Sequence, residues 1–124
     1  MSHSVLILDD DYDLRTTLSD IMQLMCDADC LVFPDVASLE RAGENALSCE
    51  VAIIDVNLGA GKPNGVDAYR WLVSHGFTGR IVFLTGHAGA STLVKEAIDS
   101  GTAAFVQKPA SIRTLCRFLE ESWR

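Results

Sequence analysis

Five short apolar runs without polar alternation constrain the fold of this chain more than any other feature of its sequence. A run of this kind is typical of a β-strand covered on both faces, as strands are in parallel sheets. Between the runs, apolar residues recur at the three- and four-residue intervals of a helix. The runs occupy residues 5–8, 30–33, 51–54, 81–84 and 103–106.

Five apolar stripes at helical spacing alternate with these runs, and the first and last of them, over 14–25 and 112–119, are the strongest. Weaker stripes cover 39–47, 66–73 and 93–98. Asn64 and Asp67 resemble the start of a helix, and Gly76 and Gly101 stand where helices should stop. With right-handed crossovers, five strands and five helices predict an α/β fold: a doubly wound five-stranded parallel sheet in a three-layer sandwich. Its site should lie outside the carboxyl ends of the strands.

Composition narrows the class of protein. The chain has 124 residues, 48% of them hydrophobic and 22% charged, so we expect one domain over 1–124 with one core. A net charge of −7 repels phosphate backbones and predicts no direct binding of nucleic acid. No apolar run approaches the roughly 20 residues of a membrane span, and the N-terminus lacks the pattern of a signal peptide. We therefore expect a soluble, cytoplasmic protein that does not bind membranes.

The pattern of the four cysteines is typical of a protein in the reducing cytoplasm. Cys26, Cys30, Cys49 and Cys116 form no Cys-x-x-Cys pair, and none has a histidine at metal-ligand spacing. We expect reduced, partly buried thiols that act as small apolar side chains.

Polar residues follow the predicted strands at their carboxyl ends. These residues are Asp9, Asp10 and Asp11 after the first run, Asp55 after the third, Thr85 after the fourth and Lys108 after the fifth. Each has an ordinary explanation alone, as a helix cap, a strand residue or a solvated charge. Gathered at one edge, however, several carboxylates repel one another unless a cation compensates them. A hard divalent ion with oxygen ligands, Mg²⁺ or alternatively Mn²⁺, is the candidate.

Charge suggests a role for each of these side chains. Asp9 and Asp10 would hold Mg²⁺, and Asp55 would attack phosphorus to form an aspartyl phosphate. Lys108 would neutralise the phosphoryl oxygens, and Thr85 would donate a hydrogen bond to one of them. Asp11 has two interpretations: it assists the ion through water, or it caps the helix that starts at Tyr12.

The same residues carry a resemblance to a known family. Residues 5–11 (VLILDDD), 53–55 (IID), Leu84-Thr85 and Lys108-Pro109, in this order, resemble the receiver domain of two-component response regulators. Each motif is weak alone, but together they are a strong signal, and the resemblance covers essentially the whole chain. It implies a (βα)5, flavodoxin-like fold and a phosphorylation-controlled signalling domain. Such a domain catalyses only its own phosphorylation and dephosphorylation and is not otherwise an enzyme.

The resemblance also implies partners and further site residues. The phosphoryl group would reach Asp55 from a histidine kinase or a histidine phosphotransfer protein, and the backbone carbonyl of Asn57 would join the ligands of Mg²⁺. Phe105 matches the aromatic switch position of the family. As Thr85 moves toward the phosphoryl group, Phe105 would turn inward and reshape an output face for a downstream effector, an output domain or a phosphorylation-dependent dimer. That face comprises the predicted helix over 93–98, the strand over 103–106 and the helix over 112–119.

His87, two residues after Thr85, has two interpretations. By the resemblance, it and Asn57 flank the path of the attacking water and tune dephosphorylation. Otherwise it is an exposed loop residue without consequence. Gly59, Gly61 and Lys62 lie in a loop after Asp55 that looks longer than is usual in the family.

Two alternatives come from other classes of protein. Haloacid dehalogenase-like phosphohydrolases also place Asp-x-Asp after a first strand, which Asp9 to Asp11 satisfy. Their pattern usually has Thr or Val where this chain has Asp13, and no second pair of aspartates lies near the C-terminus. A binding module with the same fold and no phosphorylation is the other alternative. The combination of the acidic pair with Asp55, Thr85 and Lys108 argues against it.

Overall fold

The computed structural model describes residues 3–26, 28–55, 65–85, 103–107 and 117. The strands are β1 (His3–Leu8), β2 (Ala28–Phe33), β3 (Val51–Asp55), β4 (Arg80–Thr85) and β5 (Ala103–Gln107). The helices are α1 (Tyr12–Cys26), α2 (Val36–Ala42), α3 (Glu44–Leu47) and α4 (Gly65–Ser74). All five predicted strands are therefore confirmed. Of the predicted helices, those over 93–98 and 112–119 lie outside the described residues, except that Arg117 is helical.

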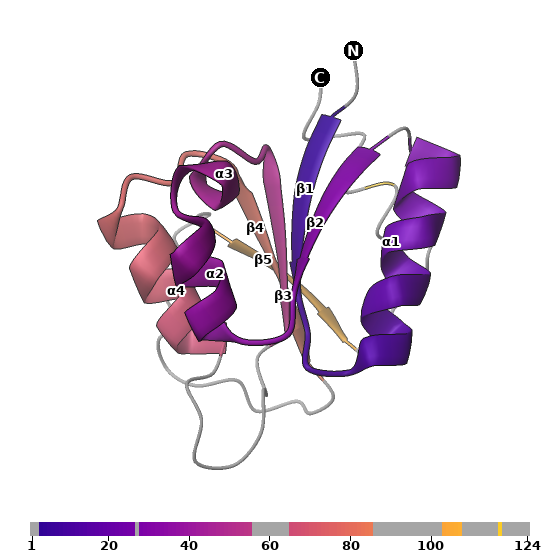
Figure 1. The fold of residues 1–124 in the computed structure, drawn as a ribbon, viewed down its shortest axis with the longest axis horizontal. Coiled ribbons are helices and arrows are strands. Elements are labelled where there is room, and N and C mark those ends of the chain that lie inside the picture. The colour runs from indigo at the N-terminus through magenta and orange to yellow at the C-terminus, as the bar shows by residue number, and fades with distance from the viewer. Residues whose placement is uncertain (1–2, 27, 56–64, 86–102, 108–116, 118–124) are drawn as a thin grey trace.

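The strands form one sheet in the order β2-β1-β3-β4-β5, with every neighbouring pair parallel. Figure 1 shows α1 on one face of the sheet and α2, α3 and α4 on the other. The chain runs from β1 outward to β2 and then back past β1 to β3 and β4. This reversal places the crossover through α1 on one face of the sheet and the later crossovers on the other. The predicted doubly wound, flavodoxin-like α/β fold is confirmed.

The core has one cluster on each face because successive strand residues point to opposite sides. Val5 and Ile7 of β1 pack with Leu18 and Met22 of α1. On the other face, Leu6 and Leu8 pack in the cluster that includes buried residues of α2, α3 and α4. Every residue of β3 is buried, as expected for an inner strand of a sheet covered on both faces.

The helical stripe over 39–47 is interrupted, which the spacing of its apolar residues did not predict. Gly43 has φ 56° and ψ −123° and separates α2 from α3. A positive φ is unfavourable for a residue with a Cβ, so glycine permits this break. Leu39 and Ala46 are still both fully buried. The stripe therefore predicted which residues are buried but not that the helix is divided.

The end of α4 confirms the prediction for Gly76. This glycine has φ 85°, and its N–H donates to the carbonyl of Val73 at 3.2 Å. The N–H of Phe77 donates to the carbonyl of Leu72 at 2.9 Å. These two bonds form the Schellman motif that commonly ends a helix. Asn64 and Gly101, the other predicted helix boundaries, lie outside the described residues.

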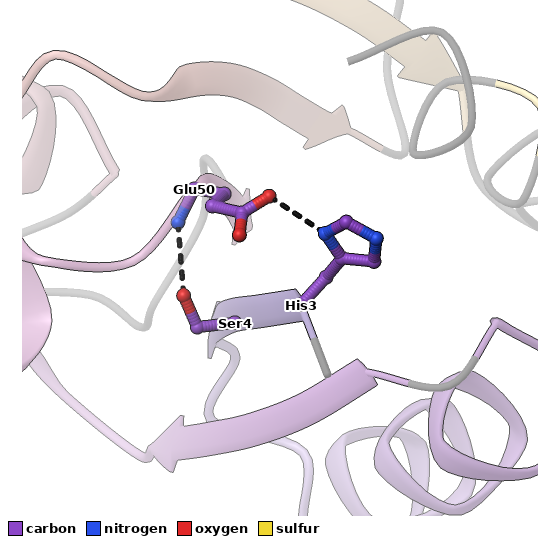
Figure 2. Close-up of polar contacts among 3 residues, drawn as sticks. All are labelled: His3, Ser4 and Glu50. Carbon is purple, nitrogen blue, oxygen red and sulfur yellow. Dashed lines mark hydrogen bonds and ion pairs between the residues drawn. The ribbon is translucent and has the colours of Figure 1, made fainter. Parts of the chain in front are cut away.

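The amino ends of β1 and β3 are joined by side-chain contacts as well as by the backbone hydrogen bonds of the sheet. His3 Nδ1 lies 3.0 Å from Glu50 Oε2, and the N–H of Glu50 lies 3.3 Å from Ser4 Oγ, as Figure 2 shows. The same N–H donates to the Ser4 carbonyl at 2.9 Å. Both side chains of the ion pair are partly exposed, so the pair contributes little stability of its own.

Cys30 and Cys49 are free thiols, as predicted. Within the described part of the chain, no helix is both long and apolar enough to cross a membrane.

Candidate functional site

The carboxyl ends of β1 and β3 lie side by side and bring three predicted acids together. Leu8, the last residue of β1, pairs with Ile54 in the register of the two strands. Asp9 and Asp10 follow Leu8 directly, and Asp55 is the last residue of β3. Adjacent strands are separated by only about 4.8 Å, so acids at these positions are necessarily close.

The three carboxylates form a compact group. One carboxylate oxygen from each of Asp9, Asp10 and Asp55 lies within 4.8 Å of the others. Asp9 is fully buried and Asp55 is 4% exposed, whereas Asp10 is exposed. Buried carboxylates at this separation repel each other and lose hydration, which favours the binding of a cation beside them.

The chemistry of the donor set fits a hard divalent cation. All three ligating groups are carboxylates, and the group contains neither sulfur nor imidazole. Mg²⁺ prefers oxygen ligands, is usually bound through one or two carboxylates and keeps several waters. The exposure of Asp10 is consistent with a site that keeps such waters.

Asp9 is held through its backbone as well as by burial. Its N–H donates to the carbonyl of Phe33 at 3.1 Å, which continues the ladder between β1 and β2 by one residue. Its Oδ1 accepts the N–H of Asp11 at 2.9 Å. Its carbonyl accepts a hydrogen bond from Arg15 Nη1 at 3.0 Å. The position of this carboxylate is therefore fixed by β2 and by the start of α1.

Asp11 occupies the position of the helix cap. It directly precedes α1, and its carbonyl accepts the N–H of Arg15 at 3.0 Å, as the carbonyl of an N-cap residue does. It does not belong to the group of three metal-capable acids found among the described residues. The structure thus favours the capping interpretation of Asp11 at the level of the backbone.

The contact of Arg15 with the site was missed by sequence reasoning. The residue lies in the first turn of α1, and helical side chains point back toward the helix N-terminus. An arginine there can therefore reach the end of β1. Its position was the available signal, although nothing in the sequence indicates that it contacts a backbone carbonyl.

The remaining predicted site residues are described only in part. Thr85 is the last residue of β4 and pairs with Gln107, and Phe105 in β5 pairs with Phe83. β4 adjoins β3, so the backbone of Thr85 lies one strand away from Asp55 and two strands away from Asp9 and Asp10. The side chains of Thr85 and Phe105 lie outside the described residues, as do Asn57, His87 and Lys108 entirely.

A doubly wound sheet with a group of acids at the carboxyl ends of two inner strands defines a class of metal-dependent or phosphoryl-binding α/β domains. Comparison with known families narrows this class. The family described as "Response regulator receiver domain" matches residues 5–120. The chain belongs to this family, which consists of signalling domains. The match favours the receiver over the phosphohydrolase alternative.

Solved structures show the same fold at low sequence identity. A CheY-like receiver domain protein from Methanospirillum hungatei JF-1 has a TM-score of 0.83 and 18% identity, covering 98% of this chain and 93% of that one. The chemotaxis protein CheY4 of Vibrio cholerae has a TM-score of 0.78 and 23% identity, covering 98% and 99%. The BeF3-activated receiver domain of DrrB has a TM-score of 0.80 and 18% identity, covering 99% and 98%. A search of curated proteins finds no match.

Proposed function

We propose that residues 1–124 are one receiver domain that accepts a phosphoryl group on Asp55 from a histidine kinase or a histidine phosphotransfer protein. The observation that carries this proposal is the group of Asp9, Asp10 and Asp55 within 4.8 Å, in a chain of the receiver family. The solved receiver of DrrB is activated by BeF3. We infer that this chain is switched in a comparable way, by an oxyanion-like group on Asp55.

The three acids have different roles in the proposed reaction. Asp55 is the nucleophile: its carboxylate oxygen forms a bond to phosphorus while the bond from phosphorus to the donor imidazole nitrogen breaks. The imidazole leaves with the electron pair of that bond. Asp9 and Asp10, together with Asp55 and the backbone carbonyl of Asn57, would hold Mg²⁺. When bound, the ion neutralises charge on the phosphoryl oxygens.

The other residues of the proposal come from the receiver pattern. Lys108 neutralises a phosphoryl oxygen, Thr85 donates a hydrogen bond to another, and Phe105 changes its rotamer with Thr85. Asn57 and His87 flank the path of the hydrolytic water and set how long the phosphoryl group persists. The backbone register of β4 and β5 places Thr85 and Phe105 on adjacent strands, which supports coupling between them.

The signalling consequence belongs to the same proposal. Phosphorylation shifts the population toward a state with an altered output face, which includes β5 and the predicted helices over 93–98 and 112–119. That face binds a downstream effector, an output domain or a second phosphorylated copy. The domain acts in the cytoplasm, where histidine kinases present their phosphorylated histidine.

Intact-protein mass spectrometry tests the phosphoacceptor. After incubation with acetyl phosphate and Mg²⁺, we expect the wild type to gain the mass of one phosphoryl group and Asp55→Asn to gain none. Chelation of Mg²⁺ should abolish the gain in the wild type. Asp13→Asn is the matched control, because Asp13 is an exposed acid of α1 outside the group of three. An unchanged mass gain in Asp55→Asn would disprove the assignment.

A further inference from the structure

We propose that Arg15 is a positioning residue of the acidic site, which holds Asp9 in the orientation that binds Mg²⁺. The inference rests on the proposed function, because it assumes that the three acids bind the ion. Its basis is the hydrogen bond from Arg15 Nη1 to the Asp9 carbonyl at 3.0 Å. This bond is partly buried, so its loss would leave a carbonyl poorly satisfied.

Arg15 contacts the backbone of Asp9 and not its carboxylate. The guanidinium donates to the carbonyl oxygen, while Asp9 Oδ1 accepts the N–H of Asp11 at 2.9 Å. Arg15 thus fixes the peptide group between Asp9 and Asp10, from which both side chains of the acidic pair are oriented. An arginine that paired with the carboxylate would instead compete with the ion for the same oxygen.

Arg15 is itself held in place on two sides. Its backbone N–H donates to the Asp11 carbonyl at 3.0 Å, in the first turn of α1. Its guanidinium carbon lies 5.3 Å from the centroid of the Tyr12 ring, in a cation–π arrangement. The side chain is half-buried, so it is restricted compared with a freely solvated arginine. Because the guanidinium of Arg15 is held in place, the Asp9 carbonyl that it bonds is held in place as well.

Charge and position predict opposite effects on the affinity for Mg²⁺. The guanidinium is a cation close to the site, and through space it repels a second cation. If charge alone mattered, its removal would make Mg²⁺ bind more tightly. If positioning dominates, its removal loosens the acidic pair and weakens binding. Groups that orient metal ligands typically change affinity by about 10-fold or more, so we expect position to dominate.

Calorimetric titration of the whole chain with Mg²⁺ distinguishes the two effects. Arg15→Met keeps an unbranched apolar stem over Tyr12 and removes both the charge and the donor. We expect it to fold and to bind Mg²⁺ roughly 10-fold more weakly than the wild type. Arg15→Lys keeps a donor and the charge, and should bind more tightly than Arg15→Met. Arg41→Met is the matched control, because Arg41 is an exposed arginine of α2 that bonds Ser38 Oγ at 3.1 Å within its own helix. It should bind Mg²⁺ as the wild type does.

The outcomes separate this inference from the proposed function. A wild type that does not bind Mg²⁺ would overturn both. A wild type that binds Mg²⁺, with Arg15→Met binding equally or more tightly, would overturn the role of Arg15 and leave the proposed function standing. Unfolding of Arg15→Met would also overturn it, because Arg15 would then be required by the fold as a whole and not by the orientation of the acidic pair. A lysine variant no better than the methionine variant would overturn it as well, because a donor at this position would then not restore the affinity for Mg²⁺.

Discussion

Cys49 is a single side chain whose ionisation the fold changes strongly. The residue is 3% exposed, and its Sγ lies 3.6 Å from the carbonyl oxygen of Asn45, to which it donates. Burial, helped by the neighbouring Cys30, raises the pKa of the Cys49 thiol from the ordinary 9.0 to about 11, although a hydrogen bond with Ser4 opposes the shift. At neutral pH this cysteine is therefore a protonated, unreactive core residue.

This raised pKa predicts a loss of stability in alkaline solution. Between about pH 9 and pH 11 the unfolded chain releases the Cys49 proton while the folded chain retains it. The contribution of Cys49 is therefore fully present below about pH 9 and falls as the pH rises toward 11. We expect Cys49→Ala to weaken the fall in the free energy of unfolding over this range, measured by urea denaturation at several pH values. The variant loses packing at every pH, so the test is the slope of the free energy of unfolding against pH. A slope equal to that of the wild type would contradict the prediction.

Single residues also show what the sequence could predict about the site. Asp9, Asp10 and Asp55 were predicted to meet because the carboxyl ends of parallel strands share one edge. The contact of Arg15 with the Asp9 carbonyl was not predictable in the same way. Any arginine can donate to any nearby backbone carbonyl, so residue type carries no information about the partner. The burial that separates Asp9 from the exposed Asp10 likewise depends on the packed elements around them.

At the level of elements, the chain enters β4 through Gly79. A glycine is needed there because a Cβ would have no space, and not because φ is positive. A Cβ on Gly79 would lie 2.5 Å from the Glu50 carbonyl oxygen, 2.6 Å from Phe77 Cζ and 2.8 Å from the Cys49 carbonyl oxygen. Two of these atoms belong to the backbone before β3, to which β4 is bonded through the Arg80 N–H and the Glu50 carbonyl. Neither strand can move away without losing that bond.

Gly79→Ala should therefore destabilise the fold by overpacking, by about 1–3 kcal/mol. Gly76→Ala is the comparison: a Cβ there meets nothing within 4 Å, but φ is +85°, so only backbone strain of about 1–2 kcal/mol is expected. Urea denaturation measures both variants. A Gly79→Ala protein as stable as the wild type would show that the backbones of β3 and β4 separate easily.

The division between α2 and α3 shows why element boundaries were harder to predict than burial. Leu39 and Ala46 keep a helical spacing across the break, and both face the core. The spacing of apolar residues reports which side of a segment is buried and is unaffected by a local turn at Gly43. Asp35, whose carboxylate accepts the Ser38 N–H at 2.8 Å, marks the start of α2. It is an ordinary N-cap that a search for capping residues can find.

For the whole molecule, we expect the repulsion among the three acids to lower the stability of the fold when no cation is bound. Asp9 and Asp55 are buried and Asp10 is exposed, and folding brings their carboxylates within 4.8 Å. The unfolded chain keeps the same charges apart and hydrated. The net charge of −7 adds to this repulsion. Ion binding should therefore appear as a gain in the stability of the entire domain.

Asp10→Asn should make the protein more stable in a chelator and less responsive to Mg²⁺. In the absence of the ion, the loss of one exposed charge relieves repulsion, by up to about 1 kcal/mol. With Mg²⁺, the variant lacks one ligand, and the gain in its free energy of unfolding should be smaller than that of the wild type. Urea denaturation with EDTA and with Mg²⁺ gives both quantities. Asp13→Asn, outside the acidic group, should show the full gain, and an equal gain in Asp10→Asn would contradict the role of Asp10.

The pairing of β1 with β3 also governs the order in which the chain can fold. Val5 pairs with Val51, so the pairing of the two strands closes a loop that contains α1, β2, α2 and α3. Closing so long a loop is a slow step, because entropy is lost before the contacts form. Repulsion between Asp55 and the pair Asp9 and Asp10 arises at that same step. If a divalent cation binds between the two strand ends, as proposed, we expect it to slow their separation and so to lengthen the lifetime of the native state.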